Sequence, residues 1–423
     1  MTRTQPIWMR TIGPHLRSCE RYIQEIFSGR YGLTDSFLKD LRTFIDSVLV
    51  IDPSMVTSAV QTLAMNTLNA YQNGVAVKWN DAELAVYLVY IFGEINKCEC
   101  ISIVNQTLAH PFMSAGGGKG RAAFCETPAV IDKDKRKLTD YSEFALTAHG
   151  QMLYTLVQSG ISAYPHHTVT LQFFETTTRY TDFFKVRKEC IMPTLHAMID
   201  QRFVLRPQRL LRDNDEYFNR GLHNQDSSVR ARVFYLFHRF IKEVRNEISP
   251  DLAASLLDGI RDLLAIQVDL PELDSPETQD LLTEAIKNPG IFDSQIYLFE
   301  TAGILNSLFF KDPVQSETLL RSIVKPLMDE LPAHLQAAKA SNDVLAILKI
   351  HHIVMALGNV AKGFPDLPSP LQEGYILPPL DVFREIGQAI LVCLEQLNVV
   401  KGVRDAVRLI NSRSLVLTLR HSG

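Results

Sequence analysis

The pattern of apolar and polar positions has helical spacing along nearly the whole chain. Apolar residues recur three or four positions apart, which places them on one side of an α-helix. The pattern predicts helices near residues 34–50, 54–73, 80–97, 140–159, 167–184, 187–201, 228–246, 251–266, 276–288, 293–310, 314–337, 342–363 and 381–399. No convincing run of alternating apolar and polar residues predicts strands. The sequence therefore predicts an all-α protein.

The predicted turns often begin with residues that can cap a helix. Examples are LTDSF at 33–37, DPSM at 52–55, SPD at 249–251 and KDPV at 311–314. Ser, Thr and Asp accept hydrogen bonds from first-turn amides, and proline fits the first helical position. Two helices with their turns occupy about 35–50 residues, the period of two-helix repeats. Because no fingerprint recurs, this spacing favours an irregular HEAT-repeat-like α-solenoid, a right-handed superhelical array of antiparallel helix pairs.

The predicted helix in SSVRARVFYLFHRFIKEVR, residues 227–245, has two different sides. At 100° per residue, one side is an apolar stripe suited to burial, made of Val229, Val233, Leu236, Phe237, Phe240 and Val244. Another flank carries Arg232, Tyr235, Arg239 and Lys242, spaced so that they share one face. Ser227 or Ser228 is expected to cap the start of this helix.

Two interpretations fit this basic flank. It could be an ordinary solvated face with one amphipathic tyrosine. It could instead follow a phosphate backbone, with arginines on phosphate oxygens and a ring available for stacking. Arg230 lies nearer the apolar stripe, which favours a structural role for that side chain.

Composition limits the classes of function. Hydrophobic residues make up 46% of the 423 residues, charged residues make up 21%, and the formal charge is −4. The chain is therefore no polycation, so any nucleic-acid affinity must come from local clusters. Six scattered cysteines indicate a reducing compartment. We identify no apolar run of about 18 residues and no secretory signal, so no membrane insertion is expected.

The sequence offers no convincing catalytic, cofactor or metal site. SAGGGKGRAAF at 114–124 lacks the first glycine of a phosphate loop and the Ser or Thr that must follow its lysine. It is better interpreted as part of a flexible loop over residues 111–138. DKDKRK at 132–137 adds Lys133, Lys135, Arg136 and Lys137, a solvated charge run or an RNA contact. CEC at 98–100 lacks the spacing of a zinc site. We therefore expect no enzyme activity and no cofactor.

Three segments resemble one protein family. RGLHNQDSSVRARVFYLFHRFIKEV (220–244) closely resembles a helix of the exportin-T family, the tRNA exporters among the importin-β-like karyopherins. TLVQSGISAYPHHTVTLQFFETTTRYTDFF (155–184) and LFETAGILNSLFF (298–310) with IVKPLMDEL (323–331) are similar to further segments of that family, in the same order. Weaker similarity extends back to residue 79 and forward to about residue 410, and the resemblance as a whole is to the fungal type.

The resemblance implies a tRNA nuclear export receptor, or the central fragment of one. Such a carrier binds tRNA cooperatively with Ran-GTP, passes nucleoporins of the nuclear pore, shuttles between nucleus and cytoplasm, and leaves GTP hydrolysis to Ran. We expect a monomer. The residues proposed to contact tRNA are basic side chains and one tyrosine, and they form three groups in order of preference. The first group is Arg230, Arg232, Tyr235, Arg239 and Lys242. The second is Arg179, Lys185, Arg187 and Lys188, and the third is Lys133, Lys135, Arg136 and Lys137.

The resemblance also predicts how the chain is divided. Residues 1–110 would form N-terminal helical repeats, 111–138 a Gly- and Lys-rich loop, and 139–410 the HEAT-like repeats of exportin-T type. Residues 203–220 are predicted to be an insertion, such as a retained intron, and 411–423 an atypical tail. Family members are expected to be about twice as long, with the main Ran-GTP grip in N-terminal repeats that this chain lacks. The alternatives are a HEAT-repeat protein-binding scaffold without RNA cargo, or a remnant that folds without carrying cargo.

Overall fold

The computed structural model describes residues 41–45, 47–48, 52–97, 123–126, 141–199, 221–268, 270, 281–287, 290–341, 343–366 and 376–397. Most of the predicted loop 111–138, with its four basic candidates, lies outside this part of the chain. The predicted insertion 203–220, the tail 411–423 and most of the helix predicted at 34–50 also lie outside it.

The described residues are almost entirely helical, as predicted, and the chain divides into two compact units. The first unit, Met1–Cys190, contains α4 (Pro53–Gln72), α5 (Trp79–Lys97), α7 (Ala148–Gln158), α8 (His167–Arg179) and α9 (Thr181–Phe184). The second, Ile191–Gly423, contains α10 (Ile191–Ile199), α11 (Ser227–Val244), α12 (Pro250–Ile260), α13 (Leu281–Lys287), α14 (Phe292–Ser307), α15 (Pro313–Ser341), α16 (Val344–Lys362) and α17 (Leu380–Leu397). Short 3₁₀ turns join several of these helices, and the part of the chain described has one isolated β-bridge, Cys125 with Leu146.

In the first unit, α4 and α5 pack together, and α5 also packs along α8. Trp79 at the start of α5 stacks on His166 just before α8, with ring centroids 4.3 Å apart. Glu94 near the end of α5 pairs with Arg179 at the end of α8. Because the first residues of the two helices lie together and their last residues also lie together, α5 and α8 run in the same direction.

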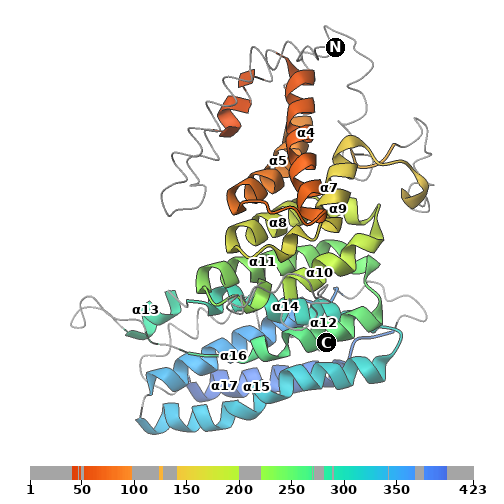
Figure 1. Cartoon of the computed structure of the whole chain (residues 1–423). Helices are drawn as coiled ribbons and strands as arrows, with labels where there is room; N and C mark the ends of the chain where they lie inside the picture. The colour runs from red at the N-terminus through yellow and green to blue at the C-terminus, as the bar shows by residue number, and fades with distance from the viewer. Residues whose placement is uncertain are drawn as a thin grey trace, which may run out of the picture. The chain divides into compact units, whose positions relative to one another are not determined.

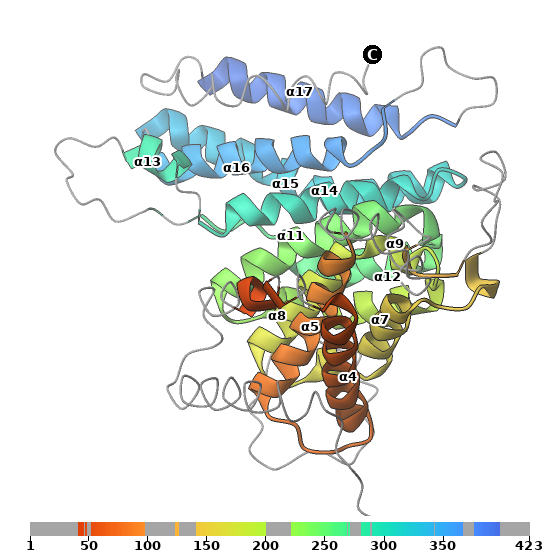
Figure 2. The same ribbon diagram turned by 90° about the horizontal axis from the view of Figure 1, so that it is seen from above.

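In the second unit, α11, α14 and α16 lie side by side, as Figures 1 and 2 show. The helix α15 runs antiparallel to α16, because Lys349 of α16 reaches Glu330 of α15 at 3.0 Å across a short turn. It also packs beside α17. In a HEAT-like α-solenoid, helix pairs stack so that their equivalent helices form layers. The second unit has this arrangement, so the predicted fold class is confirmed.

Capping explains where several helices begin. Asp52 accepts a hydrogen bond from the Met55 amide before α4, and Ser249 accepts one from the Leu252 amide before α12. Proline follows each cap, as the sequence predicted. The predicted cap of α11 was wrong. Asp226, in extended conformation, accepts from the amides of Ser228 and Val229, so its carboxylate takes the role assigned to Ser227 or Ser228.

The helix predicted at 140–159 is interrupted at its start. A 3₁₀ turn at Tyr141–Glu143 precedes α7, which begins at Ala148. Between them the backbone pairs with residues 123–126: the Glu126 amide donates to the Ala145 carbonyl, and the Thr147 amide donates to the Phe124 carbonyl. Phe124 is buried. These distant partners satisfy backbone groups that a longer helix would have used, and they anchor this piece of the predicted loop.

Two glycines bring α14 and α16 unusually close. A Cβ at Gly303 would lie 2.1 Å from the Val360 carbonyl oxygen, and one at Gly363 would lie 2.3 Å from the Glu300 carbonyl oxygen. Backbone therefore meets backbone where both helices end. This contact places Lys362, the last residue of α16, beside the last turns of α14.

Among the long helices that the structure describes, α16 is the most apolar. Among the described residues, Val344–Lys362 is the one helix that is long and apolar enough to cross a membrane by length and composition alone. However, 72% of its apolar window is buried inside the structure. That burial identifies α16 as a core helix of the second unit.

Candidate nucleic-acid interface

The α11 helix divides between core and surface as its sequence predicted. Val233, Phe237, Phe240 and Val244 are at most 1% exposed, and they pack inside the second unit. Its basic flank consists of Arg232, Tyr235, Arg239 and Lys242, here called the basic stripe. The three cations of the stripe are exposed and the tyrosine is half-buried.

Tyr235 organises the stripe. The Arg232 guanidinium lies over its ring, 5.1 Å from the centroid. Arg239 donates a hydrogen bond to its hydroxyl at 3.2 Å. Its ring also meets Tyr297 of α14 edge to face, with centroids 5.4 Å apart and planes at 72°. One ring anchored on a neighbouring helix thus holds two guanidinium groups near the surface.

Lys242 ends the stripe at a buried carboxylate. Its Nζ lies 3.2 Å from Oε1 of Glu300 in α14, and Nζ of Lys362 in α16 lies 2.5 Å from Oε2. His238 approaches the same carboxylate, with Nε2 3.6 Å from Oε1, while its Nδ1 lies 3.2 Å from the Thr301 hydroxyl. These four groups, Glu300, Lys242, Lys362 and His238, are called the Glu300 cluster below.

The cluster carries a net positive charge near neutral pH. Burial lowers the pKa of His238 to about 4, so its imidazole is neutral. Burial alone would raise the pKa of Glu300, but the hydrogen bond from Lys362 and the neighbouring charges hold it below its ordinary value. Two ammonium groups therefore face one carboxylate. Arg232 and Arg239 add two exposed guanidinium groups on the same helix as Lys242.

Arg230 does not belong to the stripe. Its side chain is half-buried, and its guanidinium points to the Asn224 carbonyl oxygen at 3.4 Å, just before the helix. This contact ties the start of α11 to the preceding turn. It agrees with the position of Arg230 near the apolar side, and we expect Arg230 to contribute less to RNA contact than Arg232 or Arg239.

The second group of basic candidates, in the first unit, is largely used in internal contacts. Arg179 forms a two-pronged ion pair with Glu94 of α5, with N–O distances of 2.9 and 3.0 Å. Arg187 donates to the carbonyl oxygens of Tyr141 and Phe144, at 3.2 and 2.7 Å. Lys185 pairs with Asp182 at 2.9 Å, and Lys188 is exposed. We therefore expect this group to contribute less to RNA binding than the basic stripe.

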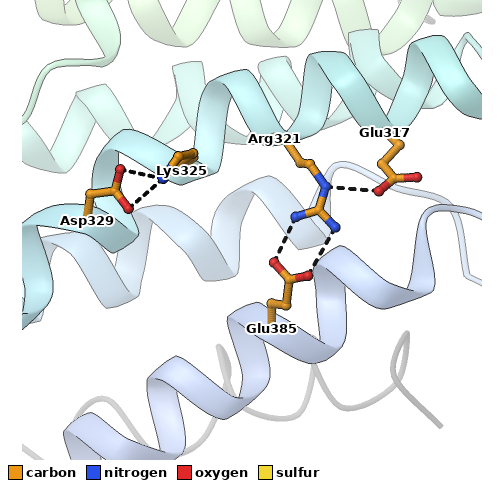
Figure 3. A network of polar contacts seen from close by, with 5 residues as sticks. All are labelled: Glu317, Arg321, Lys325, Asp329 and Glu385. Atoms are coloured by element: carbon orange, nitrogen blue, oxygen red, sulfur yellow. Dashed lines mark hydrogen bonds and ion pairs between the residues drawn. The ribbon is translucent and has the colours of Figure 1, made fainter.

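On the α15–α17 face of the second unit, cations lie beside exposed carboxylates. In Figure 3, Arg321 lies between Glu317 at 2.9 Å and Glu385 at 2.8 Å, and Lys325 pairs with Asp329 at 2.8 Å. On α17, Arg384 pairs with Asp381. Each of these three cations has at least one exposed carboxylate partner. Exposed carboxylates beside the cations weaken the attraction of such a face for a polyanion.

Sequence reasoning did not select Glu300, Tyr297 or Lys362. Lys362 has no basic neighbours within several residues, and its one local signal is its place in the last turn of a helix. Glu300 lies in a long apolar segment where a carboxylate must find partners to be buried. That pattern could have marked Glu300 as a paired charge, but not its partners.

No set of three or more His, Cys, Asp or Glu side chains within the described ranges is grouped to hold a metal ion. The candidate site consists of cationic side chains and aromatic rings. The cations of this site can bind anions, and its rings can stack on planar groups.

The comparisons with known proteins all point to one family. The sequence model of the Exportin-T family matches residues 35–112 and 129–420. The second range includes 203–220 and most of the 411–423 tail. The division of the chain that we predicted around those segments stays a prediction.

Individual relatives agree with the family match. An Exportin-T from Laccaria bicolor is 56% identical over 385 residues, covering 91% of this chain and 33% of that protein. One from Coprinopsis cinerea is 54% identical over 386 residues, with the same coverage. One from Mycosarcoma maydis is 31% identical over 381 residues, covering 88% of this chain and 32% of its own length. The chain thus spans about a third of the length of these relatives, not the half that the sequence suggested.

Proposed function

Because the chain belongs to the exportin-T family, we propose that it binds tRNA for export from the nucleus, cooperatively with Ran-GTP and in passage through nucleoporins. The observation that supports this most is the basic stripe with the Glu300 cluster. It lies across α11, α14 and α16, three helices of one layer, and two of its lysines share the single carboxylate of Glu300.

The chemistry of this face suits a folded RNA. Exposed guanidinium and ammonium groups bind phosphate oxygens without regard to base sequence, which fits a carrier that accepts many tRNAs. The solenoid arrangement suits coupling to a second ligand. Small rotations between neighbouring helix pairs add up, so two ligands that favour one curvature assist each other's binding reciprocally. The role requires no catalytic group in this chain.

The test is tRNA binding by the purified 423-residue chain, measured with and without Ran-GTP. If Arg232, Arg239, Lys242 and Lys362 each neutralise one phosphate, the logarithm of affinity falls with the logarithm of salt concentration with a slope of about −3. Affinity should then drop roughly 60-fold between about 50 and 200 mM salt.

Stronger tRNA binding in the presence of Ran-GTP would support the cooperative part of the proposal. Failure of the folded, helical chain to bind tRNA at low salt would reject tRNA binding by this chain. Ran or nucleoporin binding without tRNA binding would favour the protein-binding scaffold.

A further inference from the structure

Lys242 and Lys362 come from helices that do not adjoin, because α14 lies between α11 and α16. They nevertheless meet at one carboxylate, each on a different oxygen of Glu300. The Glu300 side chain is 3% exposed, whereas those of Lys242 and Lys362 are 51% and 47% exposed. The carboxylate is therefore covered, whereas both lysine side chains are half exposed to solvent.

This arrangement leaves binding capacity on the outer side. An ammonium group has three N–H donors, and each of these lysines gives one to Glu300. Two positive charges on one carboxylate leave one charge uncompensated, since His238 is neutral near pH 7. An approaching anion would meet donors and positive charge first, and the acceptor oxygens only behind them.

We propose that Glu300 is a positioning residue that holds the ammonium groups of Lys242 and Lys362 together as one phosphate-binding subsite for tRNA. This inference rests on the proposed function. Lysine side chains are flexible and lose rotamer freedom when they bind. Glu300 imposes that order before the RNA arrives, so less binding free energy is lost to ordering the two side chains. The subsite extends the basic stripe from α11 across α14 to α16.

The sign of one charge change separates positioning from general attraction. Replacing Glu300 by glutamine removes a negative charge, so long-range electrostatics alone would strengthen binding of a polyanion. If Glu300 positions the lysines, the same change weakens tRNA binding although the chain has become more positive. An amide oxygen still accepts a hydrogen bond but attracts an ammonium group less strongly.

The experiment measures tRNA affinity of the full chain as a function of salt for Glu300→Gln, Lys362→Ala and Lys362→Arg. Lys339→Ala, an exposed lysine at the end of α15, controls for loss of a positive charge. Glu385→Gln, a carboxylate on the α15–α17 face, controls for loss of a negative charge. Circular dichroism establishes that each variant is folded.

Lys362→Ala is expected to weaken binding about fivefold near 0.15 M salt and to make the salt slope shallower by about 0.7–0.9, as loss of one phosphate contact requires. Lys362→Arg should retain most of the affinity, because it keeps the charge and the donors. Glu300→Gln should weaken binding about threefold or more and also flatten the slope, whereas both controls stay within about twofold of the unsubstituted chain.

Unchanged affinity and slope for Lys362→Ala would overturn the subsite, and so would tighter binding by Glu300→Gln. If Glu300→Gln fails to fold, Lys362→Ala still decides whether Lys362 belongs to a phosphate-binding subsite, because the Lys362 side chain is half exposed. Binding by the unsubstituted chain with no effect of these substitutions would reject the subsite and leave the proposed function in place. A lack of tRNA binding by the unsubstituted chain would reject both.

Discussion

Replacing Arg232, Arg239 and Lys242 together by alanine is expected to weaken tRNA binding about 100-fold near 0.15 M salt. Each side chain is exposed on one face of α11, and each is expected to neutralise one phosphate. Release of one condensed counterion contributes about four- to fivefold in affinity at that salt concentration, and three contacts multiply. The slope of log affinity against log salt should also become shallower by about 2–3.

A matched control removes the same charge from the other face. Lys325→Ala, Lys339→Ala and Arg384→Ala together delete three exposed cations of α15 and α17 in the same unit. We expect this variant to keep its affinity within a few-fold, because only the long-range field has changed. Equal loss of affinity in both variants would show that net charge matters and that the basic stripe does not.

Gly303→Ala is expected to destabilise the second unit by about 3 kcal/mol, at the upper end of what overpacking a core costs. The new methyl group would lie 2.1 Å from the Val360 carbonyl oxygen, which is backbone and cannot rotate away. The helices α14 and α16 must therefore separate where they now touch. For a unit of this size, the melting temperature should fall by roughly 6–12 °C.

Gly259→Ala provides the control for this change. Gly259 is also helical, in α12, but the nearest atom to its new methyl group would be Cγ2 of the Ile199 side chain at 3.0 Å. A side chain can shift, and alanine favours helix over glycine by roughly 0.5–1 kcal/mol, so we expect little change or a small gain in stability. If Gly303→Ala and Gly259→Ala have the same melting temperature, the close backbone contact is not what holds α14 against α16.

The same contact links stability to the candidate site. Gly303 and Gly363 set the separation of α14 and α16, and Glu300 and Lys362 bridge those two helices. Separation of the helices would pull Lys362 away from the carboxylate. Gly303→Ala should therefore also weaken tRNA binding at temperatures where the chain stays folded.

The sequence predicted what depends on local pattern. The burial of Val233, Phe237 and Phe240 follows from their helical spacing, and the caps at Asp52 and Ser249 follow from short-range chemistry. The basic stripe was found in the same way, because its members lie on one face of one helix. These features need no knowledge of which helices are neighbours.

The contacts that define the candidate site could not be predicted, because their partners are far apart in sequence. Glu300 lies 58 residues from Lys242 and 62 residues from Lys362. Likewise, Arg179 of α8 forms its ion pair with Glu94 of α5, 85 residues earlier in the sequence. Within a helix an ion pair contributes only tenths of a kcal/mol, so packing between helices readily decides the partner.

The most direct test of this face as the tRNA surface is lysine protection. An amine-reactive reagent would label the full chain with and without mature tRNA, and mass spectrometry would measure the labelling of each lysine. We predict that tRNA protects Lys242 and Lys362 and leaves Lys325 and Lys339, the exposed lysines of α15, as reactive as before. Protection of Lys325 and Lys339 with unchanged labelling of Lys242 and Lys362 would place the RNA on the opposite layer and contradict the proposed interface.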